Sequence, residues 1–328
     1  MSRRPAIAPQ VWKPPATVPG TTPAQLSIRT VRLPGEGPED VLVDDDGSVL
    51  CGLLGGRILR ITPDGRTIST VADTGGRPLG LEWLPDHTLL VCDARRGLLQ
   101  VDASGNVHVL ATEAAGKPLV FCNNADVTAD GTVYFTDSSE RFGLDEWKAD
   151  LLEHSSTGRL LRRTAAGSIE VVATGLSFPN GVALTTDESR LFVAETATYR
   201  LLAMDLPDGE LTEIAALPGF PDNIATGSDG LIWVAVGSPR DPVLDFLLPR
   251  PPILRKAAWA LPDALQPRAK KIVTIQAYDA TGRLVHDLRG KDPDFFMPTG
   301  VREHDGNVWL GSLRGYHLAS FETPDSGG

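Results

Sequence analysis

Six short segments of this chain share one sequence pattern, in which a Pro or Cys is followed by two residues and then by an apolar strand. The first residue after the Pro or Cys is, in order, Glu39, Leu79, Asn123, Asn180, Asp222 and Thr299. Four of these six carry a carboxylate or amide oxygen, and Asn223 follows Asp222 directly. Calcium binds about six to eight such oxygens. If the six strands point at a common axis, the pattern predicts a calcium site made by Glu39, Asn123, Asn180, Asp222 and Asn223.

The charge of these residues suits a divalent cation. Glu39 and Asp222 together balance two positive charges, and without an ion two buried carboxylates would repel each other until one took up a proton. No His or Cys stands at the six positions, which argues against zinc or copper. In any single segment, an Asn-Gly or Asp-Asn pair after Pro is also an ordinary turn former. Its recurrence at equivalent positions favours the metal.

The spacing of the segments predicts the elements that must hold them. From the Pro or Cys at 38, 78, 122, 179, 221 and 298, the intervals are 40, 44, 57, 42 and 77 residues. Each unit continues with short apolar strands, several of them joined by Asp-Gly, which is a hairpin signal when both residues adopt positive φ. Repeats of this length with four strands are propeller blades. A pair of β-sandwiches is the alternative, but it explains no common residue at each strand opening.

The expected fold is therefore all-β, a six-bladed β-propeller over 24–323 with a central calcium site and a lid insertion. The strand-like stretch Ala24–Leu33 supplies the missing outer strand of the last blade and closes the ring. Residues 1–23 are expected to form an extended N-terminal arm, and residues 324–328 a tail.

Two insertions lengthen the repeat, at 138–157 and 237–271. The second is apolar and holds Pro249, Pro251 and Pro252, which predict two short helices in place of one long helix. We expect it to fold over the channel as a lid, with Phe246 and Trp259 lining an apolar pocket. The alternative is contact with a membrane surface, since Arg250, Arg255 and Lys256 flank the same apolar residues.

Composition limits the partners and the compartment. The net charge of −11 argues against a nucleic-acid partner. Three cysteines, an odd number set in apolar runs, predict buried reduced thiols at Cys51, Cys92 and Cys122. Met1–Gly20 lacks the apolar stretch of a signal peptide, and no long apolar run follows, so a cytoplasmic protein is expected.

A string of motifs in order carries a family resemblance. The motifs are Gly37-Pro-Glu-Asp-Val, Gly76-Arg-Pro-Leu-Gly-Leu, Val133-Tyr-Phe-Thr-Asp-Ser-Ser139, Gly158-Arg-Leu-Leu161, Phe178-Pro-Asn-Gly-Val182, Ala194-Glu-Thr196, Pro218-Gly-Phe-Pro-Asp-Asn223 and Glu303-His-Asp-Gly306. Over roughly 34–321 the chain resembles the strictosidine synthase-like proteins, including the adipocyte plasma membrane-associated type. These belong with the SMP-30 gluconolactonases and paraoxonases, whose fold is a six-bladed propeller.

The resemblance implies that Glu39, Asn123, Asn180, Asp222 and Asn223 match the calcium ligands of the hydrolytic members. It also implies that Asp222 is the acidic residue that touches the metal and acts as general base. Thr299 stands where strictosidine synthases place a catalytic Glu.

Two further positions depart from the paraoxonase pattern. Leu79 and Asp93 stand where paraoxonases place a His pair. A second, structural ion would use Asp40 and an Asp where this chain has Asn124, so one ion is expected.

The sequence thus predicts a calcium-dependent hydrolase of hydrophobic lactones or aryl esters, with Asp222 assisting the attack of water. Leu79, Thr299, His154, Phe246 and Trp259 are the candidate substrate-pocket residues, His154 because its insertion could reach the channel mouth. The alternatives are a calcium-braced scaffold without activity and a carbon–carbon bond-forming enzyme of the synthase type. The sequence does not fix the oligomeric state.

Overall fold

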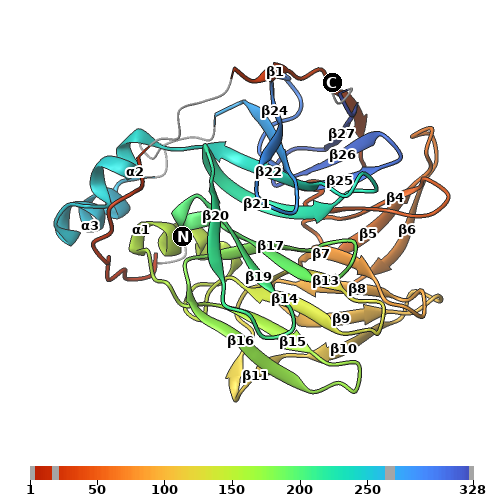
Figure 1. Cartoon of the computed structure of the whole chain (residues 1–328), viewed down its shortest axis with the longest axis horizontal. Helices are drawn as coiled ribbons and strands as arrows, with labels where there is room; N and C mark the ends of the chain where they lie inside the picture. The colour runs from red at the N-terminus through yellow and green to blue at the C-terminus, as the bar shows by residue number, and fades with distance from the viewer. Residues whose placement is uncertain (1–3, 17–21, 263–269, 325–328) are drawn as a thin grey trace.

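Six sheets of four or five strands surround a central channel in the computed structural model, which describes residues 4–16, 22–262 and 270–324 (Figure 1). In each sheet the strands follow outward in chain order from the innermost strand, except that the N-terminal strands β1 (Ala24–Gln25) and β2 (Arg29–Arg32) form the outer edges of two sheets. The inner strands of neighbouring blades contact one another all the way round, from β3 through β7, β13, β17, β21 and β25 and back to β3. The predicted six-bladed β-propeller is confirmed.

The first three blades run from residue 41 to residue 176. Blade one holds β3 (Val41–Val43), β4 (Val49–Gly52), β5 (Arg57–Ile61) and β6 (Ile68–Asp73). Blade two holds β7 (Pro78–Trp83), β8 (Leu89–Asp93), β9 (Gly97–Val101) and β10 (Val107–Ala111). Blade three holds β13 (Cys122–Val127), β14 (Val133–Asp137), β15 (Gly158–Arg163) and β16 (Ile169–Leu176). A small hairpin, β11 (Glu113–Ala114) with β12 (Lys117–Pro118), precedes blade three.

The remaining blades carry the closure of the ring. Blade four holds β17 (Pro179–Leu184), β18 (Arg190–Glu195), β19 (Arg200–Asp205) and β20 (Thr212–Ala216). Blade five holds β21 (Gly219–Thr226), β22 (Ile232–Pro239), β23 (Val273–Tyr278) and β24 (Leu284–Gly290), with β1 (Ala24–Gln25) parallel to β24. Blade six holds β25 (Pro298–His304), β26 (Asn307–Ser312), β27 (His317–Glu322) and β2 (Arg29–Arg32). Because β2 pairs with β27, the ring closes through Ala24–Leu33 as the sequence predicted.

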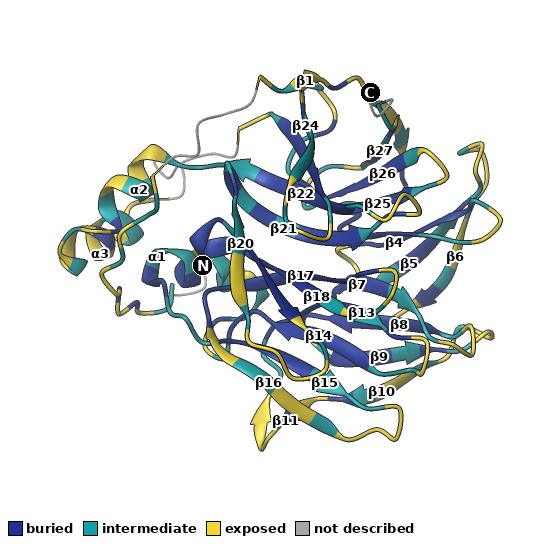
Figure 2. Cartoon of the chain, in the orientation of Figure 1, coloured by how far each residue is buried: buried dark blue, intermediate teal, exposed yellow. Residues whose placement is uncertain are grey.

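The apolar core lies between the blades. Six clusters of buried residues each join two neighbouring blades, such as Leu42 and Ile58 of blade one with Leu81 and Val91 of blade two. Figure 2 shows the inner strands buried and the outer strands β16 and β20 largely exposed on one face. The same gradient appears strand by strand, because β14 (Val-Tyr-Phe-Thr-Asp) buries every residue, whereas β16 buries only its last residue, Leu176.

The Asp-Gly hairpins are wider than the sequence predicted, with one exception. Only Asp305 and Gly306 both adopt positive φ (48° and 78°), as a two-residue turn requires. At 44–48, the amide of Gly47 donates to Asp44, and only the glycine has positive φ. There the Asp46 carboxylate accepts the amide of Ser48 and so favours a longer loop. At Asp46-Gly47, Asp130-Gly131 and Asp229-Gly230 only the glycine has positive φ, so these turns differ from the two-residue turn at Asp305-Gly306.

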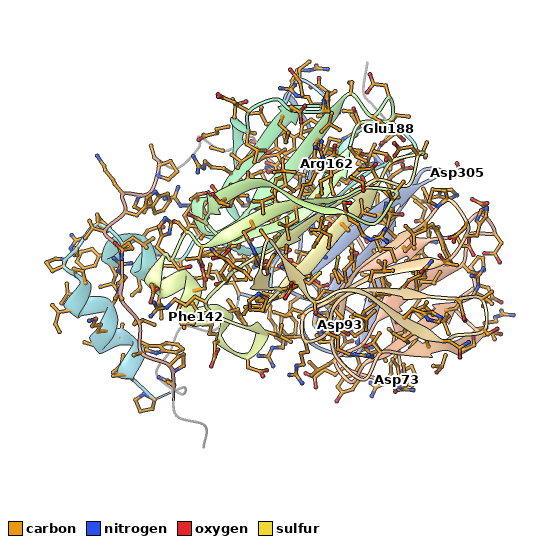
Figure 3. All side chains as sticks on the ribbon, turned by 90° about the horizontal axis from the view of Figure 1, so that it is seen from below. Asp73, Asp93, Phe142, Arg162, Glu188 and Asp305 are labelled. Carbon is orange, nitrogen blue, oxygen red and sulfur yellow. The ribbon has the colours of Figure 1, made fainter. Side chains whose placement is uncertain are left out.

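The two insertions form helices at one end of the propeller (Figure 1). The first gives η1 (Leu144–Glu146) and α1 (Trp147–Glu153), and the second gives α2 (Pro242–Leu247) and α3 (Pro252–Ala260). Asp241 caps α2 by accepting the amides of Val243 and Leu244 at 2.8 and 2.9 Å. Pro242 and Pro252 each stand in the first turn, so the predicted pair of short helices is confirmed. In Figure 3, Phe142 lies beside these helices, whereas the turn residues Glu188 and Asp305 lie at the opposite end.

The N-terminal segment 4–16 has no helix or strand, yet it ties the insertions together. The amides of Ala8 and Gln10 donate to the carboxylate and carbonyl of Glu153 on α1. Trp12 donates to the carbonyl of Leu248, and the Trp259 indole of α3 donates to the carbonyl of Pro5 at 2.9 Å. The arm is therefore a strap across α1, α2 and α3.

Arg255 of α3 joins the strap to the two insertions. Its buried guanidinium donates to the carbonyls of Leu152 (2.9 Å), Gln10 (2.5 Å) and Leu248 (3.4 Å), one from each segment. A guanidinium with several donors in a fixed fork can join three chain segments at once.

Among helices in the described residues, none is long and apolar enough to cross a membrane.

Replacing Arg255 with Met should release the strap and leave the propeller folded. The substitution orphans buried carbonyls, each at a cost of about 1–3 kcal/mol. We expect hydrogen exchange to accelerate in 4–16 and in α1–α3 while the blade strands stay protected. Arg250→Met is the matched control, because that guanidinium lies over the Phe246 ring of its own segment. Unchanged exchange in Arg255→Met would show that the strap does not depend on this residue.

Candidate metal centre and cavity

The anchor residues lie at bulges on the inner strands. In blades two to six the pairing of the first strand with the second skips two residues immediately after the Pro or Cys, for example between Pro179 and Val182. A bulge frees residues from the ladder and re-aims their side chains. In blade four it frees Asn180 and Gly181. In blades two to five the first freed residue lines a cavity at the helix end of the channel.

The second freed residue alternates between polar side chains and glycine around the channel. The six are Asp40, Gly80, Asn124, Gly181, Asn223 and Gly300. A Cβ on Gly181 would lie 2.2 Å from the amide nitrogen of Ile224, and one on Gly80 2.7 Å from the Cα of Asn124. Glycine in alternate blades lets the polar neighbours fill the axis. The alternation is visible in the sequence only when the second residue of each pair is aligned as well as the first.

Asp40 and Asn124 are engaged within the protein. Asp40 accepts the amide of Leu81 (3.0 Å) and the side chain of Asn124 (3.3 Å), and the Asn124 Oδ1 accepts the amide of Val182 (2.9 Å). Arg302 lies close to Asp40 and donates to Glu82 at 2.7 Å. An internal guanidinium therefore supplies positive charge to this part of the channel, and the residues expected for a second ion are already paired.

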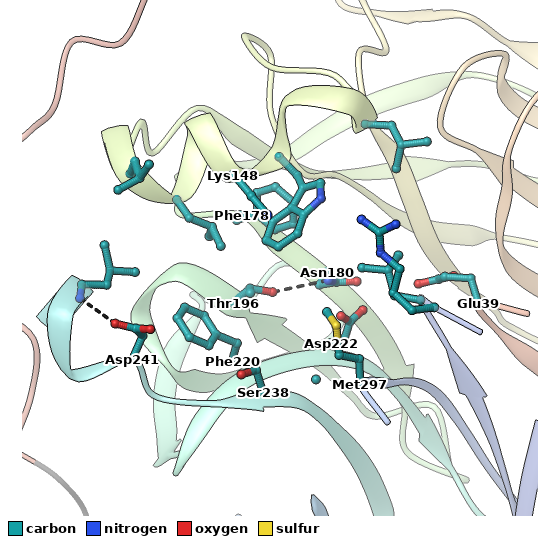
Figure 4. Close-up of a pocket in the computed structure, with 18 of the residues that line it drawn as sticks. Glu39, Lys148, Phe178, Asn180, Thr196, Phe220, Asp222, Ser238, Asp241 and Met297 are labelled. Carbon is teal, nitrogen blue, oxygen red and sulfur yellow. Dashed lines mark hydrogen bonds between the residues drawn. The ribbon is translucent and has the colours of Figure 1, made fainter. Parts of the chain in front are cut away.

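Four first-position residues meet at the floor of one cavity. Glu39, Asn123, Asn180 and Asp222 all line a cavity of about 750 Å³, and Figure 4 shows Glu39, Asn180 and Asp222 facing the same space. Glu39, Asn123 and Asn180 are buried, while Asp222 is partly exposed. Asn223 is buried behind them, where its Nδ2 lies 3.4 Å from both carboxylate oxygens of Glu39.

The amide oxygens of this cluster have no partner. The Oδ1 atoms of Asn123, Asn180 and Asn223 are buried and accept no hydrogen bond, although an unsatisfied buried acceptor costs about 1–3 kcal/mol. Each Nδ2, in contrast, lies within hydrogen-bonding distance of a protein oxygen. Three free amide oxygens and two carboxylates form an oxygen-only donor set of the kind that calcium prefers. Within the described residues, no three His, Cys, Asp or Glu side chains gather as a metal site, so a cation here would depend on the amides.

Without a cation the two carboxylates resist ionisation. Burial raises the pKa of Glu39 well above its usual value, and the nearby Asp222 and Asp40 raise it further. Although the Asp222 side chain is partly exposed to the cavity, desolvation raises its pKa to about 7, and a hydrogen bond from the Asn180 amide opposes that rise. A divalent cation would stabilise both ionised forms. The residues present fit such an ion.

The rest of the cavity is lined mostly by apolar residues, several of them from the two insertions. Its walls include Leu79, Phe121 and Phe178 from the blades. Its upper lining comes from η1, α1, α2 and α3, at Leu144, Trp147, Leu151, Leu152, Val243, Leu244, Leu247 and Ala258. Lys148 and Arg314 add positive charge to the lining. An apolar cavity with a few convergent polar groups is the usual form of a small-molecule site.

Of the five candidate pocket residues, Leu79 lies in the lining and the other four lie elsewhere. The buried Thr299 hydroxyl donates to the carbonyl of Glu39 at 2.6 Å. His154 is buried and stacks on Trp12, with ring centroids 4.4 Å apart. Phe246 is 55% exposed. Trp259 packs against a small apolar cluster formed by Ile7, Phe142 and Ala149. Periodicity could not tell which face of each short helix turns inward.

Other sequence expectations have a structural outcome as well. Cys51, Cys92 and Cys122 are free and buried, as predicted. The Asp93 carboxylate accepts hydrogen bonds from the backbone amides of Arg77, Arg95 and Arg96. It therefore fixes the turn that follows β8 in blade two. The second insertion lines the cavity from one side, while Phe246, Ile253 and Leu254 stay exposed on the other. The alternative of membrane contact therefore remains a prediction.

Comparison with known proteins agrees with this architecture. Residues 51–241 match the family model described as SMP-30/Gluconolactonase/LRE-like region, and residues 26–61 match the strictosidine synthase-like N-terminal model. The chain is a strictosidine synthase-like member of the SMP-30/gluconolactonase family.

Its relatives span both plants and animals. It is 35% identical to the adipocyte plasma membrane-associated protein of Danio rerio over 87% of this chain and 75% of that protein. It is 34% identical to protein strictosidine synthase-like 13 of Arabidopsis thaliana over 76% of this chain, and it spans only 62% of that relative. Among solved structures, the fold is similar to a Xanthomonas campestris gluconolactonase, with a TM-score of 0.66 at 20% identity over 98% of this chain and 99% of that one. It is also similar to a calcium-binding regucalcin of Agrobacterium tumefaciens, with a TM-score of 0.60 at 14% identity over 89% and 97%.

His154 predicts a measurable pH dependence of stability. Burial, together with Arg255 and Arg200, lowers the pKa of His154 to about 4, against about 6.5 in an unfolded chain. Below pH 6.5 the unfolded state binds a proton that the folded state does not, so stability falls as the pH drops towards 4. At pH 5 this loss is at most about 2 kcal/mol.

His154→Asn should remove that part of the pH dependence, and Asn tolerates the positive φ at this position. Urea unfolding of both proteins at pH 7 and pH 5 measures it. Other titrating groups are common to both and cancel in the difference. Equal losses of stability in the two proteins would show that His154 titrates normally in the folded state.

Proposed function

We propose that this protein is a calcium-dependent hydrolase of lactones or aryl esters with hydrophobic substituents. The observation that carries the proposal is the set of unpartnered amide oxygens beside Glu39 and Asp222 at the floor of an apolar cavity. The names of the structural relatives support it, since one is a gluconolactonase and another a calcium-binding protein. Glu39, Asn123, Asn180, Asp222 and Asn223 are the proposed ligands.

Calcium bound there would polarise the substrate carbonyl and stabilise negative charge on its oxygen. Asp222 is the proposed general base, because it is the partly exposed carboxylate at the cavity floor. Water attacks the carbonyl carbon and gives a proton to Asp222, and the ester C–O bond breaks as that proton passes to the leaving oxygen. The products are a carboxylic acid and an alcohol, joined in one molecule when the substrate is a lactone. The cavity walls hold the substrate in place, which raises the effective concentration of water and base.

The helices from the two insertions act as the lid in this proposal. They supply the apolar side chains above the metal position and exclude bulk water from it. Mobility of the strap at 4–16 would then set how readily substrate enters.

Hydrolysis should require both the metal and Asp222. Purified protein is assayed with phenyl acetate and a panel of lactones, before and after treatment with a chelator and after readdition of calcium. Chelation should abolish turnover reversibly. Asp222→Asn should lower kcat by at least about 100-fold, the usual contribution of general base catalysis. Asp305→Asn is the control, since Asp305 lies in a turn at the far end of the blade.

The assay also separates the alternatives. Activity that survives both chelation and Asp222→Asn would overturn the proposed mechanism. Bound calcium with no turnover of any ester or lactone would favour a calcium-braced scaffold. Condensation chemistry of the synthase type would lack its carboxylate, because Thr299 stands where the resemblance places the catalytic Glu.

Substrate preference should follow apolar length. Each methylene buried in the cavity contributes up to about 0.8 kcal/mol, or about fourfold in kcat/KM. We expect kcat/KM to rise along a homologous series of γ-lactones until the cavity is filled. A flat series, or a preference for polyhydroxylated sugar lactones, would contradict the hydrophobic assignment and leave the calcium site unaffected.

A further inference from the structure

The two amide side chains that face the cavity each have a dedicated hydroxyl partner. Asn123 Nδ2 lies 2.8 Å from the Oγ of Ser138, and Asn180 Nδ2 lies 3.4 Å from the Oγ1 of Thr196, as Figure 4 shows for the second pair. Ser138 and Thr196 are both buried and lie just beyond the second strand of the same blade as their Asn.

The hydroxyls can only accept from these amides. Ser138 Oγ donates its proton to the carbonyl of Pro179 at 2.7 Å, and Thr196 Oγ1 donates to the carbonyl of Pro221 at 2.7 Å. A hydroxyl has one proton, so once it is given to a backbone carbonyl the remaining lone pairs must accept. Each hydroxyl therefore binds the amide nitrogen of its Asn and leaves the amide oxygen without a hydrogen-bond partner. The Asn180 amide also donates towards Asp222 and lowers the pKa of that carboxyl.

The hydroxyls occur only where an amide has to be oriented. In blade four, the first inner-strand residue after the bulge is Val182, which pairs with Val193 on the second strand. Thr196 lies three residues after Val193. The equivalent position in every other blade is found in the same way. In order of the blades these positions hold Leu54, Ala94, Ser138, Thr196, Gly237 and Leu313. The two hydroxyls thus stand in the two blades whose anchor is Asn, and in no other.

The physical reason is the asymmetry of an amide. A carboxylate presents the same oxygen whichever way it turns, whereas an amide offers a cation either a ligand or a repelling N–H group. In the metal-free protein the carboxylates of Glu39 and Asp222 attract N–H donors, as the contact of Asn223 with Glu39 illustrates. An unrestrained amide would turn its nitrogen into the channel. At Asp222, by contrast, the equivalent position is Gly237, where an added Cβ would lie 3.2 Å from Oδ2.

We infer that Ser138 and Thr196 are positioning residues that lock the side-chain amides of Asn123 and Asn180 with their oxygens towards the cavity, and so set the affinity of the site for calcium. This inference rests on the calcium site of the proposed function. The hydroxyls also couple successive ligands, because Pro179 and Pro221 directly precede Asn180 and Asp222. The three ligands Asn123, Asn180 and Asp222 are joined in one chain of contacts.

Calcium affinity, measured by titration calorimetry on the chelator-treated full chain, is the direct test. Partners that orient ligands are worth about 10–100-fold in metal affinity. Ser138→Ala and Thr196→Val should each weaken binding by at least about tenfold. Thr196→Ser keeps the hydroxyl and should bind calcium as the unmodified protein does.

Thr226→Val is the matched structural control. The Thr226 hydroxyl donates to the carbonyl of Leu184, another link between neighbouring blades, but no amide ligand contacts it. Its loss should leave calcium affinity unchanged. Thermal unfolding of every variant in chelator verifies that the propeller still folds.

A double-mutant cycle separates orientation from simple bracing. In an Asn180→Asp background the ligand is symmetric, so Thr196→Val should cost far less affinity than it does beside Asn180. An equal loss in both backgrounds would show that Thr196 acts only through the Pro221 backbone, which overturns the inference.

The failures are distinguishable. Calcium binding that is unaffected by Ser138→Ala and Thr196→Val would overturn the orienting role and leave the proposed function intact. An unmodified protein that binds no calcium would overturn both. Absence of hydrolysis with normal calcium binding would overturn only the enzymatic proposal, since the affinity measurements do not depend on turnover.

Discussion

The site depends on one constraint, which is that buried polar oxygens need a partner. The amide oxygens of Asn123, Asn180 and Asn223 are buried and accept no hydrogen bond. They lie near the carboxylates of Glu39 and Asp222, whose ionised forms are disfavoured by desolvation. A cation with oxygen ligands satisfies both requirements at once. The same groups would be costly in a channel that held nothing, and this cost supports the proposed metal site.

The propeller creates this arrangement by repetition. In blades two to six the inner strand opens with a bulge, and in blades two to five the first residue of the bulge lines the cavity. Glycine at Gly80, Gly181 and Gly300 makes room for Asp40, Asn124 and Asn223 in the intervening blades. Because the blades pack on one another through six apolar clusters, a ligand's position is fixed by the core of the whole ring. Residues of the two insertions line the cavity, and Arg255 holds the insertions together through the N-terminal strap.

Much of this could be predicted from the sequence, because it depends on period and residue type. The spacing of the six anchors predicted the propeller, and the strand-like stretch before Pro34 predicted the closure through β2. The convergence of Glu39, Asn123, Asn180 and Asp222 on one cavity followed from their equivalent positions.

What the sequence did not predict depends on contacts between segments far apart in the chain. His154 was expected near the channel mouth, but Trp12 covers it, and that contact joins residues with no shared periodicity. Phe246 and Trp259 lie on the short helices α2 and α3. Contacts with α1 and the N-terminal segment, such as those of Trp259, determine which side of a helix faces the rest of the protein. The hydroxyls of Ser138 and Thr196 look ordinary in the sequence, and their role emerges only when the strand register aligns them with Asn123 and Asn180.

The central claim is that the amide oxygens, with the two carboxylates, hold calcium on the propeller axis. A crystal structure determined in millimolar calcium, with anomalous scattering to identify the ion, tests it directly. The account predicts one ion at the cavity floor, bound by Glu39, Asp222 and the Oδ1 atoms of Asn123, Asn180 and Asn223. A floor that stays free of any ion, or an ion bound elsewhere while the amides turn their nitrogens inward, would contradict it.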